Sequence, residues 1–565
     1  MSIAARSTRF LGALSLATLF AFQLEAQSGS PAELKVVPPR VACTALKLVD
    51  VSGPVGAKTT LQEAVEVQDG QPAPYCRVLG TIAPAIQFEV RLPLGGWTQR
   101  YLQTGCGGLC GTLNISTPRA DSCVPVTNGD VVLASTDMGH RNGPGRGNAD
   151  PTWAVENPQS KIDFAYRGVH LTAIAAKALI EKFYGQKPRY SYFSGCSDGG
   201  REALMEAQRY PQDFDGIAAG APAMNFVTQN TFYHGWNAWK NTDSTGNAIL
   251  TPDKLPILHQ AALDACDALD GLKDGQITVP SACHFDPAVT ICKDGQDGAT
   301  CLTPAQAATA KAIYQGARTE TGKKLVIGGP QPGSELFWQG VYVPQRAGAA
   351  IFSTGISLGT IKYLAYEKPL APEFGLKDFH FDRDNFDAIA QMHPIYDATD
   401  PDLEKFSAAG GKLLMFHGWS DPHISPLNSI AYYMAMERTM GEAKVSKFAR
   451  LFLFPGGGHC NGGDGPFDFP LLSLLVNWVE GGTPPNAILA SRKQGGKVDR
   501  TRPVYPFPII AKYKGTGDPN SASSFEGVRD PQVTPEQLDW LGAAFYLPGY
   551  EKSCEWTGTE MKCKR

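Results

Sequence analysis

Short apolar segments alternate with helical patterns in two stretches of the chain. Residues 87–93 alternate apolar and polar side chains with period two, as in a half-buried strand. Residues 131–135 and 216–221 are short and apolar, as in buried strands. Residues 163–184 have apolar positions at helical spacing and end at Gly185. This alternation predicts right-handed parallel crossovers in an α/β sheet.

The alternation of strand and helix patterns stops between residues 225 and 396, where the chain is rich in Gly, Pro, Trp and Tyr. The alternation then resumes. Strands are predicted at 411–418 and 448–454, and helices at 426–440 and about 469–480. We therefore predict one α/β sheet domain, built from residues 27–224 and 397–565, with a lid domain, residues 225–396, inserted in it.

One segment joins an aromatic strand to a helix through Gly195-Cys196-Ser197-Asp198-Gly199. Gly-x-Ser-x-Gly is typical of a nucleophile elbow, in which a serine sits on a strained strand-to-helix turn. The pattern alone is weak, because a chain with 60 glycines produces it by chance. Its context in the rest of the chain decides its meaning.

A serine nucleophile needs a histidine base and a carboxylate, each in a loop after a strand. Of the ten histidines, only His459 lies in a glycine-rich loop directly after the last apolar strand, and Asp421 lies in the loop after the strand before it. Asp421 could instead cap the next helix. His417 and His423 could contact substrate or lie elsewhere on the surface. Gly107 and Gly108 follow the strand predicted at 97–102 and could supply an oxyanion donor, or form only a flexible loop.

Composition and charge exclude some classes of partner. A net charge of −4 and a pI of about 6.2 give no basic face for nucleic acid and no polybasic membrane signal. Arg6 and Arg9 precede an apolar run over residues 10–22, which predicts a signal peptide, residues 1–26, and a secreted or periplasmic protein. A short membrane anchor is the alternative for this run.

Thirteen cysteines in an exported chain indicate disulfides, and their odd number leaves at least one unpaired. Structural zinc is disfavoured because the chain has no pair of Cys-x-x-Cys elements. Cys196 directly precedes Ser197 and Cys460 directly follows His459. If Ser197 and His459 meet, a bond between these two cysteines becomes feasible.

The segment Gly-Cys-Ser-Asp-Gly-Gly-Arg-Glu at 195–202 and Gly-Gly-His-Cys at 457–460 resemble the tannase and feruloyl esterase family, as do residues 134–140, 163–167 and 214–223. The resemblance implies an α/β-hydrolase fold and a triad of Ser197, Asp421 and His459. It implies an oxyanion hole made by the amide of Asp198 and one from Gly107 or Gly108. It also implies five disulfides: Cys43–Cys76, Cys196–Cys460, Cys266–Cys283, Cys292–Cys301 and Cys554–Cys563. For the remaining cysteines we predict a Cys110–Cys123 bond and a free Cys106.

Residues 267–276 contain three carboxylates and two glycines, a composition that suits calcium. The loop lacks the bidentate glutamate of an EF-hand, so a solvated acidic turn is the alternative. The resemblance favours a structural Ca²⁺ in the lid. Its ligands would be the side chains of Asp267, Asp270 and Asp274 and the carbonyls of Leu272 and Gln276.

Together these features predict a secreted serine hydrolase that cleaves carboxylic esters of aromatic acids. Trp338, Tyr342 and Phe352 are candidate walls for the substrate ring, although lid aromatics often only pack. Arg346 could bind a substrate carboxylate, as a terephthalate monoester would require, or remain a surface residue. The rival functions are a terephthalate monoester hydrolase, a non-catalytic binding module and a serine peptidase. The sequence leaves the oligomeric state open.

Overall fold

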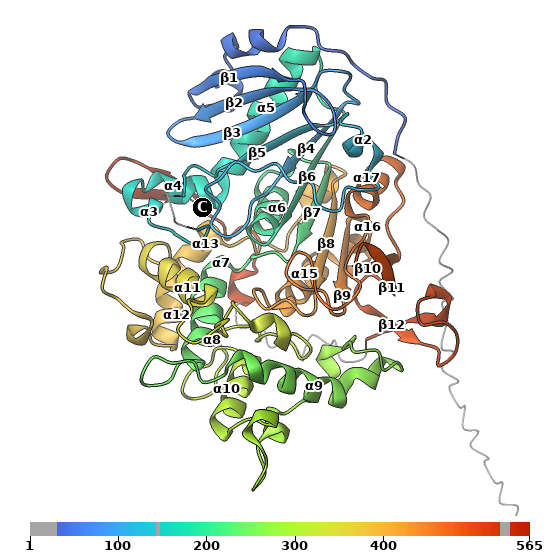
Figure 1. Ribbon diagram of the computed structural model, residues 1–565. Coiled ribbons are helices and arrows are strands. Elements are labelled where there is room, and N and C mark those ends of the chain that lie inside the picture. The colour runs from blue at the N-terminus through green and yellow to red at the C-terminus, as the bar shows by residue number, and fades with distance from the viewer. Residues whose placement is uncertain (1–30, 143–146, 531–542, 565) are drawn as a thin grey trace, which may run out of the picture.

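The computed structural model describes residues 31–142, 147–530 and 543–564, and the predicted signal peptide lies outside the described residues (Figure 1). At its centre is a nine-stranded sheet of order β1-β2-β3-β5-β4-β6-β7-β8-β9. The pairs from β1 to β5 are antiparallel, and those from β5 to β9 are parallel. The strands are β1 (Thr59–Val67), β2 (Tyr75–Ile82), β3 (Ile86–Pro93), β4 (Arg100–Thr104), β5 (Val132–Thr136), β6 (Tyr190–Cys196), β7 (Gly216–Gly220), β8 (Lys412–Gly418) and β9 (Ala449–Phe454).

Helices cover both faces of this sheet. Strand β8 is buried on both sides: Leu413 and Met415 belong to one apolar core, and Leu414 and Phe416 to another. Side chains of neighbouring residues point to opposite faces of a strand, so these two cores lie on opposite sides of the sheet. The first core includes residues of α5 (Gly168–Tyr184), α6 (Asp198–Arg209) and α15 (Pro426–Met440), and the second includes residues of α17 (Leu471–Gly481).

These elements confirm the predicted α/β sheet. The predicted helix 163–184 begins with a π-helical turn, Asp163–Arg167, and continues as α5. The predicted helix 426–440 coincides with α15. The other short helices around the sheet are α1 (Ser52–Val55), α2 (Val124–Thr127), α3 (Trp153–Glu156), α4 (Gln159–Ile162) and α16 (Glu442–Phe448).

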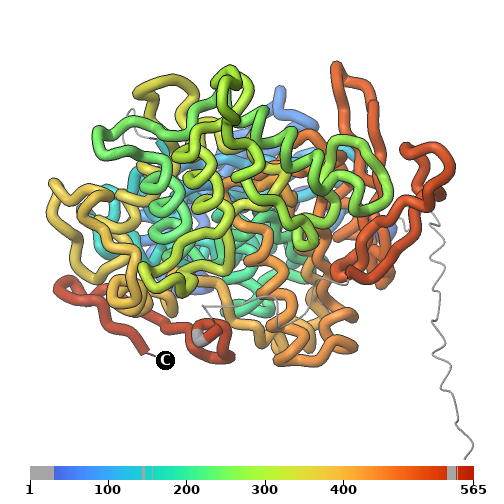
Figure 2. The backbone as a smooth tube through the Cα atoms, turned by 90° about the horizontal axis from the view of Figure 1, so that it is seen from below, coloured from blue at the N-terminus to red at the C-terminus, as the bar shows by residue number. Residues whose placement is uncertain are grey.

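Between β7 and β8 the described residues add helices and turns but no strand to the sheet. Figure 2 shows this segment, in green to yellow, lying across one side of the sheet domain. It has an apolar core of its own, which includes Leu258, Ile313 and Trp338. The fold is therefore an α/β hydrolase with an inserted domain. The helices between β7 and β8 are α7 (Phe226–Thr228), α8 (His234–Lys240), α9 (Leu255–Cys266), α10 (Pro304–Gln315), α11 (Phe352–Tyr363), α12 (Arg383–Ile389), α13 (His393–Tyr396) and α14 (Glu404–Ala408), the last of which lies beyond the predicted lid.

Hairpins complete the chain after α17. They pair β10 (Ile488–Gln494) with β11 (Lys497–Val504), β12 (Ile509–Tyr513) with β13 (Phe525–Arg529), and β14 (Ser553–Trp556) with β15 (Met561–Lys564). Among the described residues, no helix has both the length and the apolar character needed to cross a bilayer.

Candidate active site

Ser197 occupies the sharp turn between β6 and α6, with a backbone φ of 65° and ψ of −121°. A positive φ is strained for a residue with a side chain, and the flanking strand and helix maintain it here. A Cβ atom on Gly195 would lie 2.2 Å from the carbonyl oxygen of Gly199, and one on Gly199 would lie 2.9 Å from that of Cys106. The two glycines are thus required by close backbone approach, and the turn has the geometry of a nucleophile elbow.

The loops after β8 and β9 bring Asp421 and His459 together. Oδ2 of Asp421 lies 2.7 Å from Nδ1 of His459. Burial alone would raise the pKa of Asp421, but the attraction of His459 and hydrogen bonds from His417 and His459 outweigh it and hold that pKa well below its usual value. An ionised carboxylate can only accept, so Nδ1 of His459 donates and Nε2 is left as the acceptor.

A disulfide ties the elbow to the histidine loop. Cys196 and Cys460 are bonded, with their Cα atoms 5.8 Å apart, although 264 residues separate them in the chain. Each cysteine is the chain neighbour of one proposed catalytic residue. The bond therefore restricts how far Ser197 and His459 can separate.

Ser197 and His459 line one cavity of about 270 Å³, together with Gly107, Gly108 and Asp198. The amides of Gly105, Cys106, Leu109, Cys110 and Gly111 all donate hydrogen bonds within the described structure. Those of Gly107 and Gly108 have no partner among the described residues. The amide of Asp198 also has none, as expected in the first turn of α6. The cavity thus has free backbone donors beside the serine, as an oxyanion hole requires.

The lid closes the other side of this cavity. Phe226, Asn230 and His234 line it from one continuous helical segment, and Phe352 lines it from α11. Burial and the neighbouring His423 and His459 hold the pKa of His234 well below its usual value, so its ring is neutral. Phe352 was a candidate wall from the sequence, whereas Phe226, Asn230 and His234 were not predicted to line the cavity. The i, i+4, i+8 spacing of Phe226, Asn230 and His234 was the signal that could have found them.

The family profile described as "Tannase and feruloyl esterase" matches residues 70–528. The chain belongs to this family. It is similar to the mono(2-hydroxyethyl) terephthalate hydrolase of Piscinibacter sakaiensis, with 32% identity over 87% of this chain and 92% of that protein. It is 33% identical to a probable feruloyl esterase of Arthroderma benhamiae, over 83% of this chain and 90% of that one. The crystal structure of feruloyl esterase B from Aspergillus oryzae aligns with a TM-score of 0.74 and 27% identity, covering 86% of this chain and 99% of that chain.

Membership of the tannase and feruloyl esterase family identifies the chain as a carboxylic ester hydrolase. All five disulfides that the sequence resemblance implied are present. The prediction of a Cys110–Cys123 bond was wrong. Cys106 bonds to Cys110 across a short loop, and Cys123 is buried as a free thiol whose pKa burial raises to about 11.

Three residues predicted to contact substrate lie elsewhere. His417 is buried between Asp421 and Ser429, with Nε2 3.1 Å from Oδ2 of Asp421, so it supports the acid and does not line the cavity. Trp338 is fully buried in the lid core, where its indole N–H donates to Ser334. Arg346 is exposed on the lid and is not part of the cavity wall. The sequence shows which lid residues are aromatic or charged, but not whether their side chains point into the cavity.

The acidic loop at 267–276 folds around its own carboxylates. The Asp267 carboxylate accepts hydrogen bonds from the backbone amides of Asp274, Gly275 and Gln276. The Asp270 carboxylate accepts hydrogen bonds from the amide of Leu272 and the hydroxyl of Thr278. Asp274 pairs with Arg502 through Oδ2, while its Oδ1 is buried without a partner among the described residues. Burial and the charges of Asp274 and Asp267 raise the pKa of Asp270. This Asp274 oxygen could accept a hard cation, but among the described residues the ligand atoms of Asp267, Asp270 and Asp274 do not all lie within 4.8 Å of one another.

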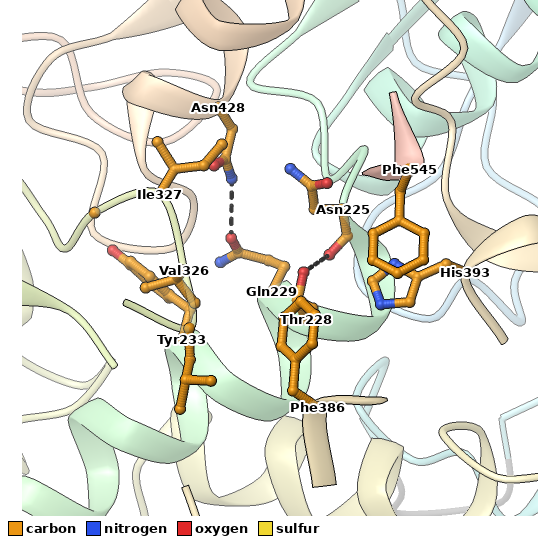
Figure 3. Close-up of a pocket in the computed structure, with 12 residues that line it drawn as sticks. Asn225, Thr228, Gln229, Tyr233, Val326, Ile327, Phe386, His393, Asn428 and Phe545 are labelled. Carbon is orange, nitrogen blue, oxygen red and sulfur yellow. Dashed lines mark hydrogen bonds between the residues drawn. The ribbon is translucent and has the colours of Figure 1, made fainter. Parts of the chain in front are cut away.

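A second, smaller cavity of about 30 Å³ shares the lining residue Gln229 with the active-site cavity. Figure 3 shows the Gln229 side chain accepting a hydrogen bond from Asn428 at 3.3 Å, with His393 stacked against Phe545 on the opposite side. Its volume suits water and not an aromatic acid. It is therefore not a substrate pocket.

Proposed function

We propose that this enzyme cleaves carboxylic esters of aromatic acids through an acyl-enzyme formed on Ser197. The supporting observation is a single cavity lined by Ser197, the Asp421-bonded His459, and Gly107, Gly108 and Asp198, whose amides have no partner within the described part of the chain. The Ser197 oxygen would attack the ester carbonyl while Nε2 of His459 takes its proton. The amides of Asp198 and of Gly107 or Gly108 would stabilise the oxyanion.

Collapse of the tetrahedral intermediate breaks the bond to the alcohol, which leaves with the proton held by His459. A water molecule then attacks the acyl-enzyme, its proton goes to His459, and the acid is released as His459 passes that proton to the oxygen of Ser197. Asp421 stabilises the imidazolium in both halves of the reaction. His417 contacts the same carboxylate oxygen of Asp421 as His459 does.

The cavity favours an acyl group without a second charge. Apolar walls come from Phe226, Phe352 and Ile356, and polar contacts from neutral side chains such as Asn230 and His234. No lysine or arginine is among the described residues that line it, so the free carboxylate of a terephthalate monoester would lack a charged partner. These features support hydroxycinnamate or gallate esters over terephthalate monoesters.

Side-by-side kinetics on methyl ferulate, methyl gallate and mono(2-hydroxyethyl) terephthalate test this proposal. We expect the highest kcat/KM on one of the first two esters. We also expect Ser197→Ala to lower kcat by about 10⁵-fold or more with an unchanged melting temperature. Undiminished turnover by Ser197→Ala would refute the acyl-enzyme, and a preference for the terephthalate ester would refute the substrate class.

We further propose that the chain is exported, with residues 1–26 as signal peptide, and that the loop 267–276 binds a structural Ca²⁺. Asp267, Asp270 and Asp274 would hold the ion with their carboxylates, and Leu272 and Gln276 with their carbonyls. The orphaned Asp274 oxygen supports this ligand set. Bound calcium would offset the repulsion among the carboxylates. Chelation should lower the melting temperature and remove one calcium per chain, and no change in either would contradict the proposal.

A further inference from the structure

The loop that carries Gly107 and Gly108 is closed at its two ends by the Cys106–Cys110 disulfide. Within this five-residue ring, the amide of Cys110 donates to the carbonyl of Gly107 at 3.1 Å. Two adjacent glycines are the most flexible backbone that a chain can have. A bond across the loop removes much of that freedom, and the two unpartnered amides are held inside it.

The Cys106 end of the ring is fixed to the helix that begins at the elbow. Its amide donates to Oε1 of Glu202 at 3.1 Å, and its carbonyl accepts the amide of Gly199 at 2.6 Å. Glu202 is buried on α6, and its Oε1 also lies 2.8 Å from Sγ of Cys106 and 3.5 Å from Sγ of Cys110. Burial raises the pKa of Glu202 to about 8, which lets its carboxyl group lie against the sulfur atoms without a full charge.

The far end of the ring is fixed as well. The amide of Leu109 donates to the carbonyl of Asn148 at 2.6 Å, and the carbonyl of Leu109 lies 2.6 Å from Nε2 of the buried His140. Both anchors leave the amides of Gly107 and Gly108 untouched. The contacts on either side thus fix the loop, while the amides of the cavity-lining Gly107 and Gly108 have no partner among the residues that the structure describes.

The same cluster does not serve as a metal site. Cys106, Cys110, Asp198 and Glu202 bring four potential ligand atoms within 4.8 Å of one another. However, the two sulfur atoms are bonded to each other, and both carboxylate oxygens of Asp198 accept hydrogen bonds from Arg201. A disulfide has no thiolate to offer a metal. The cluster is better suited to holding backbone in place.

We propose that the Cys106–Cys110 bridge and Glu202 are positioning residues that hold the Gly107 and Gly108 amides on the developing oxyanion. This inference rests on the proposed function, because it requires an oxyanion at Ser197. Oxyanion donors accelerate a reaction only when they are already in place as charge develops. A displacement of about 1 Å costs about 100-fold in rate, so a rigid loop directly benefits kcat.

The experiment compares the bridge-free variant Cys106→Ser/Cys110→Ser with Cys554→Ser/Cys563→Ser, which removes a disulfide in the terminal hairpin β14–β15. We expect the first variant to lose about 10- to 100-fold in kcat with KM changed less than about threefold, and the second to keep wild-type kcat. Inactivation by a phosphonate ester, which mimics the oxyanion, should slow in parallel with kcat. Inhibition by free ferulate, which does not, should be unchanged.

Glu202 offers a second, independent test. Glu202→Gln keeps an acceptor for the Cys106 amide and should retain most of kcat, whereas Glu202→Ala should lose about tenfold. This pair carries the test if the bridge-free variant fails to fold. Wild-type kcat and phosphonate reactivity in the bridge-free variant, or an equal loss in the hairpin control, would overturn the inference. If Ser197→Ala keeps turnover, the proposed function fails instead.

Discussion

The two walls of the active-site cavity are built in different ways. On the sheet side, Ser197, Asp421 and His459 follow β6, β8 and β9, so the parallel register places all three at one edge. On the lid side, lining residues come from the helical segment 226–240 and from α11, and other lid aromatics such as Trp338 lie in a separate core. Strand topology specifies the first wall, whereas side-chain packing specifies the second. Substitutions in the two walls should therefore have different kinds of effect.

The largest effect is expected on the sheet side, from Asp421→Asn. The amide keeps the shape but removes the charge that stabilises His459, and it favours the wrong imidazole tautomer. We expect kcat to fall by about 10⁴-fold with little change in KM, measured on a nitrophenyl or ferulate ester. A loss below about tenfold would show that Asp421 is not the triad acid.

In the lid, Trp338→Ala should act on stability and not on chemistry. The side chain is fully buried, so its removal leaves a cavity and should lower the free energy of unfolding by about 3–5 kcal/mol. Denaturant unfolding measures this loss, and kcat at a temperature where the variant is folded should stay near wild type. A selective fall in kcat would place Trp338 in the substrate wall after all.

On the sheet side, the charge of Asp421 should also make the stability of the fold depend on pH. Because the folded-state pKa of Asp421 lies below its usual value of about 3.9, the carboxylate stabilises the fold above about pH 4, and this contribution is lost as the pH falls toward the folded-state pKa. The stability difference between wild type and Asp421→Asn should thus narrow as the pH falls below about 4. A difference that does not narrow on acidification would contradict the assigned charge pairing.

The smallest effect is expected from Phe352→Ala, which removes an aromatic wall of the cavity. Its ring lies edge-on to His423 and His234. Losing one aromatic contact of about 0.5–1.5 kcal/mol should raise KM by up to about tenfold with kcat nearly unchanged. Arg346→Ala is the matched control, since it lies on the lid surface and should change neither constant. A larger effect of Arg346→Ala on the terephthalate ester would reopen that substrate.

The sequence by itself determined the strands from β3 to β9, the elbow and the loops that carry Asp421 and His459, but not β1, β2 or the antiparallel pairing of that edge. These follow from local rules: period-two strands, helical spacing and glycines that allow close backbone approach at Gly195 and Gly199. The sequence also indicated that Cys196 and Cys460 could form a disulfide, because each is the chain neighbour of a residue of the proposed triad. The strands, the elbow, the two loops and this cysteine pair can be predicted because they depend on neighbouring residues and on the order of the strands along the chain.

Only the tertiary structure decided which side chains face the cavity. The side chains of three predicted substrate-binding residues have suitable chemistry for binding but do not face the cavity. Those of His417 and Trp338 are buried in the protein interior, and that of Arg346 is exposed to solvent. The pairing of Cys106 with Cys110 was also beyond the sequence, since any two of three cysteines could bond. The direction of a side chain and the partner of a cysteine depend on contacts between segments that are distant in the chain, and composition and periodicity do not record those contacts.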